Sequence, residues 1–294
     1  MKQLMTEKDI SQQLNSEQPL LIFGGPYSNL QATRALQQQA EKLGIPPSHC
    51  ICTGDTVAYC ASPNETVTLL RYWGVTVLMG NCEKSLAEDA DDCGCGFTNG
   101  SQCDLLSTQW YRYAKAQLND DHRLWFKQLP EKITFHFSGV NCQVVHGGVT
   151  SINRFIFPSD PETVFTEEFT HTEADIIFAG HCGIPFTYQL TNKANKKLWH
   201  NTGAIGLPAN DGATTTWFSL VYPVSRGKIR IEHHPLDYDF TSARQAMITT
   251  GLDNGYADAL SSGLWPSMDI LPATERQNRG ITLVTRKIEW SINH

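Results

Sequence analysis

The chain has 294 residues, of which 40% are hydrophobic and 18% charged, and its formal net charge is −7. This composition supplies enough apolar side chains for a sizeable core, which excludes an intrinsically disordered chain. The negative charge argues against binding to a nucleic-acid backbone, and because no apolar run reaches the roughly 18 residues of a membrane span, we expect no membrane partner.

The first part of the chain alternates predicted strands with predicted helices. Apolar runs at 19–24, 49–53 and 75–79 are typical of buried strands. The segments 29–43 and 64–73 instead carry apolar side chains at roughly helical spacing. Because strands that alternate with helices are joined by right-handed crossovers, this order favours an α/β fold with a largely parallel core.

The remainder of the chain is richer in predicted strands. The stretch 84–104 contains many Asp, Gly and Cys residues and predicts a loop or an insertion. The elements predicted after it are helices at 105–119 and 121–128, strands at 132–138, 141–146, 175–179, 186–190, 196–200, 214–222 and 228–233, and helices at 240–250 and 254–263. The close spacing of these strands indicates hairpins, and therefore a mixed sheet or two packed sheets. Since no repeat or low-complexity linker divides the chain, we expect one domain over 1–294, closed by C-terminal helices near 240–263.

Four predicted strands are each followed by a glycine and a potential metal ligand. These pairs are Gly54-Asp55, Gly80-Asn81, His146-Gly147 and Gly180-His181. In α/β folds, ligands bind at the carboxyl ends of strands, where the loops carry functional groups. One Asp, one Asn and two His provide oxygen and nitrogen donors that suit Zn, Mn or Fe. Together they predict a metal site.

Each of these residues also has a structural explanation. Asp55 is a typical cap for the turn after its strand, and Asn81 is typical of an Asx-turn. A single His after a strand is more often a hydrogen-bonded structural residue than a ligand. Only the joint pattern, with one such residue at each of the strand ends, favours the metal site.

The order of these segments resembles the motifs of the calcineurin-like metallophosphoesterases, especially their compact bacterial branch. That branch reads Asp-x-His-Gly-Asn, Gly-Asp-x-Val-x-Tyr-Gly, Gly-Asn-His-Asp/Glu, His-Gly and Gly-His-x-His. The residues that match the later motifs are Gly54–Tyr59, Gly80-Asn81 with Glu83, His146-Gly147 and Gly180-His181, and the resemblance covers most of 19–263. It implies an α/β sandwich of two mixed β-sheets flanked by helices, and metal-dependent hydrolysis of a phosphate ester.

The chain departs from the family's pattern at specific positions. Gly25 and Tyr27 stand where the first motif has Asp and His. Cys82 replaces the His of the third motif, and Gly183 replaces the second His of the last. In the family, two metals share the Asp that corresponds to Asp55, and the positions of Gly25, Tyr27 and Gly183 belong to the first metal. The departures therefore fall on one metal and on the His that assists the leaving group.

The resemblance implies that the second metal keeps its full ligand set. These ligands are Asp55, Asn81, His146 and His181. We therefore expect about one divalent ion per chain, Mn, Fe or Zn, at a mononuclear site that activates a water molecule. The expected substrate is a small-molecule phosphate ester.

The predicted catalytic residues are Asn81, Cys82 and Asn29. The Cys82 thiol is a poor neutral substitute for an imidazole acid, and next to a cation its thiolate becomes a candidate ligand instead. Tyr27 is expected either to donate a hydrogen bond to a phosphoryl oxygen, to bind a ferric ion as phenolate, or only to fill the volume of the missing metal.

Cys93, Cys95 and Cys103 make the predicted loop rich in cysteine. They predict a thiolate metal site or a redox-sensitive lid that recruits Cys82, or else a glycine-rich loop in which the cysteines are incidental. The odd total of nine cysteines, and a start without the apolar segment of a secretory signal, favour a reducing, cytoplasmic location.

Two rival functions stay open at this point. One is a non-catalytic metal- or ligand-binding descendant of the fold, and the other is a thiol-based redox protein built around Cys82 and the 93–103 loop. The block at 23–29 separates the binder from an enzyme, because an enzyme must replace the lost Asp and His by other means.

Overall fold

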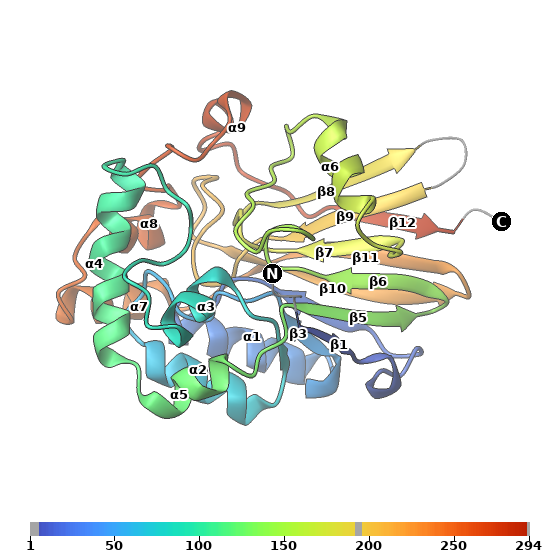
Figure 1. Cartoon of the computed structure of the whole chain (residues 1–294), viewed down its shortest axis with the longest axis horizontal. Coiled ribbons are helices and arrows are strands. Elements are labelled where there is room, and N and C mark those ends of the chain that lie inside the picture. Colours follow the sequence, from blue (N-terminus) through green and yellow to red (C-terminus); the bar gives the residue numbers. More distant parts are fainter. Residues whose placement is uncertain (1–5, 192–195, 293–294) are drawn as a thin grey trace.

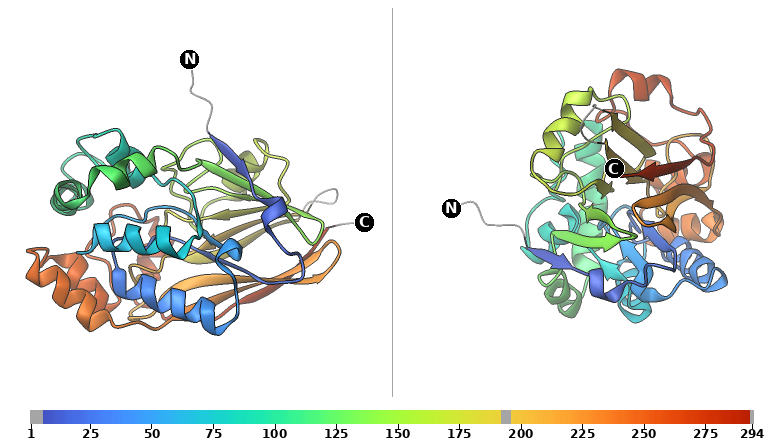
Figure 2. Two further views of the ribbon diagram at one scale, coloured as in Figure 1. Left: turned by 90° about the horizontal axis from the view of Figure 1, so that it is seen from below. Right: turned by 90° about the vertical axis from the view of Figure 1, so that its right-hand side faces the viewer.

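The chain forms two six-stranded mixed β-sheets. The sheets pack face to face (Figures 1 and 2). The computed structural model describes residues 6–191 and 196–292. Sheet A contains, in spatial order, β1 (Glu7–Asp9), β5 (Lys132–Phe137), β6 (Val140–Val144), β7 (Ile176–Ala179), β9 (Lys196–Thr202) and β8 (Pro185–Thr191). Sheet B contains β12 (Lys287–Ser291), β11 (Lys228–Leu236), β10 (Thr216–Ser225), β2 (Leu20–Phe23), β3 (Cys50–Cys52) and β4 (Thr76–Val77). The predicted α/β sandwich of two mixed sheets is confirmed.

Helices flank both sheets. They are α1 (Leu30–Lys42), α2 (Pro63–Trp73), α3 (Asn81–Ala87), α4 (Gln102–Gln117), α5 (Asp120–Phe126), α6 (Glu162–Phe169), α7 (Phe240–Thr249), α8 (Gly255–Ser262) and α9 (Ala273–Gln277), with short 3-10 helices at Ser11–Gln13 and Pro47–His49. The helices α4, α7 and α8 gather at the left-hand end of the view in Figure 1. Across the described ranges, we find no helix that combines the length and the hydropathy required for a membrane crossing.

Alternate side chains of β2 belong to two different cores. Leu20 and Ile22 lie between the sheets together with Phe178 of β7, whereas Leu21 and Phe23 pack with the helices that cover sheet B. Successive side chains of a strand point to opposite faces, so a strand buried on both sides has a continuous apolar sequence. A third apolar cluster packs α6 against the outer face of sheet A.

The structure differs from the sequence-based expectation in several segments. The loop predicted at 84–104 is shorter, because α3 extends to Ala87 and α4 already begins at Gln102. Short helices, α6 and α9, also form where no element is predicted. The unpredicted strands β1 and β12 lie at the edges of the sheets, where β1 pairs with β5 and β12 with β11. Such strands depend on pairing with a neighbour more than on their own propensity.

Candidate metal centre

Loops from both sheets meet and bring the four predicted ligands together. In sheet B, Asp55 follows β3, and Asn81 begins α3 shortly after β4. In sheet A, His146 follows β6 and His181 follows β7. Because β3 is parallel to β4 and β6 to β7, these loops leave the same edge of each sheet. Asp55 and His181 adopt φ angles of +53° and +63°, a costly conformation that is often found at functional sites.

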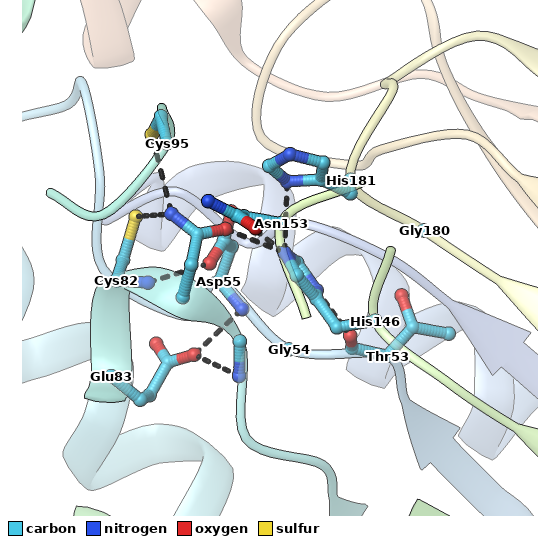
Figure 3. Close-up of polar contacts among 12 residues, drawn as sticks. Thr53, Gly54, Asp55, Cys82, Glu83, Cys95, His146, Asn153, Gly180 and His181 are labelled. Atoms are coloured by element: carbon cyan, nitrogen blue, oxygen red, sulfur yellow. Dashed lines mark hydrogen bonds and ion pairs between the residues drawn. The ribbon is translucent and has the colours of Figure 1, made fainter. Parts of the chain in front are cut away.

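The ligand atoms converge on Nε2 of His146 (Figure 3). This nitrogen lies 3.2 Å from Asp55 Oδ2, 3.0 Å from Asn81 Oδ1 and 3.1 Å from His181 Nδ1. All of these side chains are buried. Within the described part of the chain, Asp55, His146 and His181 form the one group of three Asp, Glu, His or Cys side chains whose ligand atoms all lie within 4.8 Å of one another.

Hydrogen bonds around the cluster identify the atoms that carry lone pairs. Nδ1 of His146 lies 2.7 Å from the Thr53 carbonyl oxygen, which only accepts, so Nδ1 carries the hydrogen and Nε2 of the neutral ring has a free lone pair. Nδ2 of Asn81 donates to the Cys93 carbonyl oxygen at 2.8 Å, which turns Oδ1 toward His146. Lone-pair atoms therefore face one another, an arrangement that is favourable only with a proton or a cation between them. A carboxylate, an amide oxygen and two imidazoles suit a divalent transition-metal ion or Zn.

The protonation of the cluster follows from its burial and charge. Burial acts to lower the pKa of His146, but the Asp55 carboxylate raises it overall. Burial likewise acts to raise the pKa of Asp55, but the partnership with His146 lowers it overall. Burial, and then the neighbouring His146, lower the pKa of His181 to about 3, so this ring is neutral and free to coordinate. A metal ion has to displace the proton that His146 and Asp55 otherwise share.

Two cysteine thiols contact the amide nitrogen of Asn81. Its Nδ2 lies 3.2 Å from Cys95 Sγ and 3.6 Å from Cys82 Sγ, and Cys95 Sγ lies 2.6 Å from Cys93 Sγ. Burial raises the pKa of Cys82, and the hydrogen bond with Cys82 raises the pKa of Cys95, so both thiols are neutral. In the described residues these sulfurs form no group of three ligands of the kind defined above. Their contacts orient Asn81 and do not support a separate thiolate metal site.

We expect Cys95→Ala to weaken metal binding about tenfold, the loss that is typical when a partner of a metal ligand is removed. The substitution removes one of the contacts that hold Asn81 Nδ2. The Cys93 carbonyl and Cys82 Sγ remain as partners, so the amide oxygen is held less firmly toward His146. Competition with a chromophoric chelator measures the affinity. Cys95→Ser, which keeps an acceptor, and Cys103→Ala, on α4, are the matched controls and should bind metal like the unaltered protein. Equal affinity of Cys95→Ala would show that the thiol does not position the ligand.

Aromatic rings cover Gly25 and Gly183, two of the positions at which the chain departs from the resembled motifs. A Cβ atom on Gly25 would lie 2.3 Å from Cζ of Tyr27, so the Tyr27 ring folds directly over this glycine. Gly25 also has a φ of +39°, which disfavours any side chain there. A Cβ atom on Gly183 would lie 3.2 Å from the Trp265 ring. These contacts favour the interpretation that Tyr27 fills the volume of a missing metal.

The predicted catalytic residues Asn29 and Cys82 lie in different surroundings. Asn29 caps α1 and is not brought to the cluster: its Oδ1 accepts from Ala32 N at 3.1 Å, and its Nδ2 donates to Gly206 O at 3.0 Å. Cys82 lies beside the cluster, and its backbone N–H donates to Asp55 Oδ1 at 3.2 Å. Because burial raises the pKa of the Cys82 thiol, it is a weak acid for a leaving group at neutral pH.

Glu83 also belongs to the site, although the sequence predicts no role for it. Its side chain is completely buried. Its carboxylate accepts hydrogen bonds from Asp55 N at 2.8 Å, Thr56 N at 2.7 Å, Thr56 Oγ1 at 2.8 Å, Val57 N at 3.3 Å and Gly80 N at 2.9 Å. It therefore ties the loop after β3 to the start of α3 and fixes Asp55 relative to Asn81. A Glu three residues after the N-cap residue, here Gly80, is the signal that could have found it.

A cleft that is partly open to solvent opens onto the cluster. Asp55 and His181 are among the residues that line it. Its aromatic lining residues are Tyr27, Tyr59, Phe97, Phe155, Tyr256 and Trp265. A small molecule in this cleft therefore reaches the candidate metal centre.

Comparisons with known proteins agree with the fold. No family model matches the chain. An uncharacterized protein of Methanocaldococcus jannaschii is 24% identical over 258 residues, which make up 83% of this chain and 98% of that protein.

Solved structures are similar over most of the chain. A metallophosphoesterase from Sphaerobacter thermophilus is 19% identical with a TM-score of 0.64, over 84% of this chain and 99% of its own. A hypothetical protein from Pyrococcus horikoshii OT3 is 15% identical with a TM-score of 0.68, over 83% of this chain and 98% of its own. These likenesses confirm the resemblance at the level of architecture: the chain has the fold of the calcineurin-like metallophosphoesterases.

Proposed function

We propose that the protein is a metal-dependent hydrolase of phosphate esters with a mononuclear site formed by Asp55, Asn81, His146 and His181. The observation that carries this proposal is the convergence of their lone-pair atoms at the ends of parallel strands. The fold by itself hosts unrelated functions, so the donor set and the adjoining cleft provide the stronger support.

The residues of the site have different roles in the proposed reaction. Asp55, Asn81, His146 and His181 would hold a divalent ion, which would lower the pKa of a bound water molecule to near 7 and polarise a phosphoryl oxygen. Asp55 is the one charged ligand, and the Thr53 carbonyl keeps His146 in the tautomer that presents Nε2. Burial, and then the Asp55 carboxylate, raise the pKa of Tyr27, so its hydroxyl keeps its proton and serves as a hydrogen-bond donor in the cleft.

Metal analysis and a substrate screen test this proposal. We expect purified protein to hold about one divalent ion per chain and to hydrolyse bis(4-nitrophenyl) phosphate in the presence of Mn, Fe or Zn. Elemental analysis and release of nitrophenolate are the measurements, and chelator-treated protein is the control. Near-complete occupancy by two ions per chain would contradict the mononuclear site.

A non-catalytic binding protein is the second candidate, and a specific observation favours it. The rings of Tyr27 and Trp265 cover the positions of lost ligands, and Cys82 takes the place of the imidazole that assists the leaving group. A binding protein has no need to replace these functions. Uptake of one metal without hydrolysis by any of the three metals would favour this candidate.

A further inference from the structure

The cleft beside the candidate metal centre has an aromatic and mostly apolar wall. No Lys or Arg is present among the described residues that line it. Phe155 stacks on the His181 ring with centroids 4.0 Å apart, and Phe97 stacks on Phe155 at 6.3 Å. The aromatic surface therefore begins at a predicted ligand and continues along the cleft.

Trp265 is held in a defined position in this wall. Its Nε1 donates to the Pro208 carbonyl oxygen at 2.6 Å, and its backbone N–H donates to Asn210 Oδ1 at 2.8 Å. Its ring packs over Gly183, where a Cβ atom would lie 3.2 Å away. Because the ring and the backbone of Trp265 are already fixed, stacking of an aromatic ligand on this ring costs little side-chain conformational entropy.

We infer that this cleft selects a phosphodiester with a single negative charge that carries an aromatic ring, and that the aryl oxygen is the leaving group. The ring lies along the wall formed by Trp265 and Phe97, and the phosphoryl group lies at Asp55 and His181. This inference rests on the proposed function, since it names the substrate class of the same site.

The charges of the cleft favour a diester over a monoester or a polyphosphate. The ligand set carries one negative charge, on Asp55, because His146 and His181 are neutral as ligands. With a divalent ion the centre has a net charge of about +1, which one phosphodiester anion balances. A second phosphate charge would be buried beside aromatic side chains without a Lys or Arg partner, which is unfavourable.

The chemistry of the leaving group favours an aryl ester. In hydrolysis, the water oxygen forms a bond to phosphorus, the bond from phosphorus to the aryl oxygen breaks, and its electron pair leaves with that oxygen as phenolate. The water gives one proton to solvent and keeps the other on the new monoester. A phenol has a pKa near 10, whereas a hydroxyl such as that of water has one near 15.7. An aryl oxygen therefore departs more readily than an alkyl oxygen at a site where Cys82 stands in place of the imidazole of the resembled motif.

Titration calorimetry with slowly hydrolysed probes tests the ligand class. The probes are diphenyl phosphate, with rings and one charge, diethyl phosphate, with one charge and no ring, and phenyl phosphate, with a ring and two charges at neutral pH. We expect metal-loaded protein to bind diphenyl phosphate about tenfold more tightly than either of the others. Metal-free protein should keep the preference for diphenyl over diethyl phosphate. Equal affinities for these two diesters would overturn the inference.

Matched variants locate the binding surface. Trp265→Leu should weaken diphenyl phosphate binding about fivefold and leave diethyl phosphate binding unchanged. Tyr72→Leu, at an aromatic side chain that is 88% exposed and outside the cleft, is the control. Phe97→Leu provides a second test if Trp265→Leu lowers the melting temperature. If neither cleft variant changes the preference, the aromatic wall does not bind the ring.

Kinetics separate this inference from the proposed function. For bis(4-nitrophenyl) phosphate, Trp265→Leu should raise KM about fivefold at unchanged kcat. Tight binding of diphenyl phosphate without hydrolysis in any metal would refute the proposed function and leave the ligand class standing. Equal kcat/KM of Trp265→Leu and the unaltered protein for bis(4-nitrophenyl) phosphate would refute the role of the aromatic wall in recognition and leave the hydrolase standing.

Discussion

Replacing Asp55 with Asn is expected to abolish hydrolysis and to weaken metal binding about a hundredfold or more. This loss exceeds the one that is typical when only a hydrogen-bond partner of a metal ligand is removed. Asp55 is the one carboxylate in the cluster, with Oδ2 at 3.2 Å from His146 Nε2, and an amide oxygen lacks the charge that offsets a divalent ion. The change is mild for the fold, because Asn tolerates the φ of +53° well. The amide oxygen of Asn is also still able to accept from Cys82 N.

Elemental analysis and nitrophenolate release measure the two effects of Asp55→Asn. Asp258→Asn is the matched control, because Asp258 lies on α8 with a side chain that is 68% exposed, and it should keep full metal content and activity. Activity that survived Asp55→Asn would have to come from another part of the chain or from a contaminant.

The predicted ligands could be found from the sequence because each one lies next to a local signal. Asp55 and His181 follow apolar runs that form β3 and β7. Such runs locate strand ends, and strand ends of an α/β fold meet at one edge. The same reasoning gives the sandwich, since alternating and closely spaced strands restrict the architecture to a few layered folds.

The contacts that shape the site are long-range, and the sequence carries no local signal for them. Trp265 covers Gly183 from a segment outside every predicted element. The contact of Cys95 with Asn81 depends on how the irregular segment between α3 and α4 folds back. Asn29 shows the opposite case, because its position in a resembled motif suggests an active-site role whereas its hydrogen bonds are those of a helix cap.

The largest effect on stability is expected from Glu83→Gln. Glu83 is fully buried, and Oε2 accepts from Asp55 N and Gly80 N while Oε1 accepts from the Thr56 N–H and hydroxyl. Gln keeps one acceptor oxygen but directs its NH₂ group at two N–H donors, which leaves buried groups unpaired. With about 1.5 kcal/mol or more for each lost bond to a charged acceptor, the free energy of unfolding should fall by about 3 kcal/mol.

Urea denaturation of metal-free protein measures this change, so that lost metal affinity does not contribute to it. Glu88→Gln is the matched control: Glu88 is exposed and follows α3 directly, and its loss should cost less than about 0.5 kcal/mol. Burial, and then the nearby Asp55 carboxylate, raise the pKa of Glu83, so relief of this repulsion opposes the loss of hydrogen bonds. If Glu83→Gln unfolded at the same urea concentration as the unaltered protein, the buried hydrogen bonds of Glu83 would make no net contribution to stability, and this prediction would be wrong.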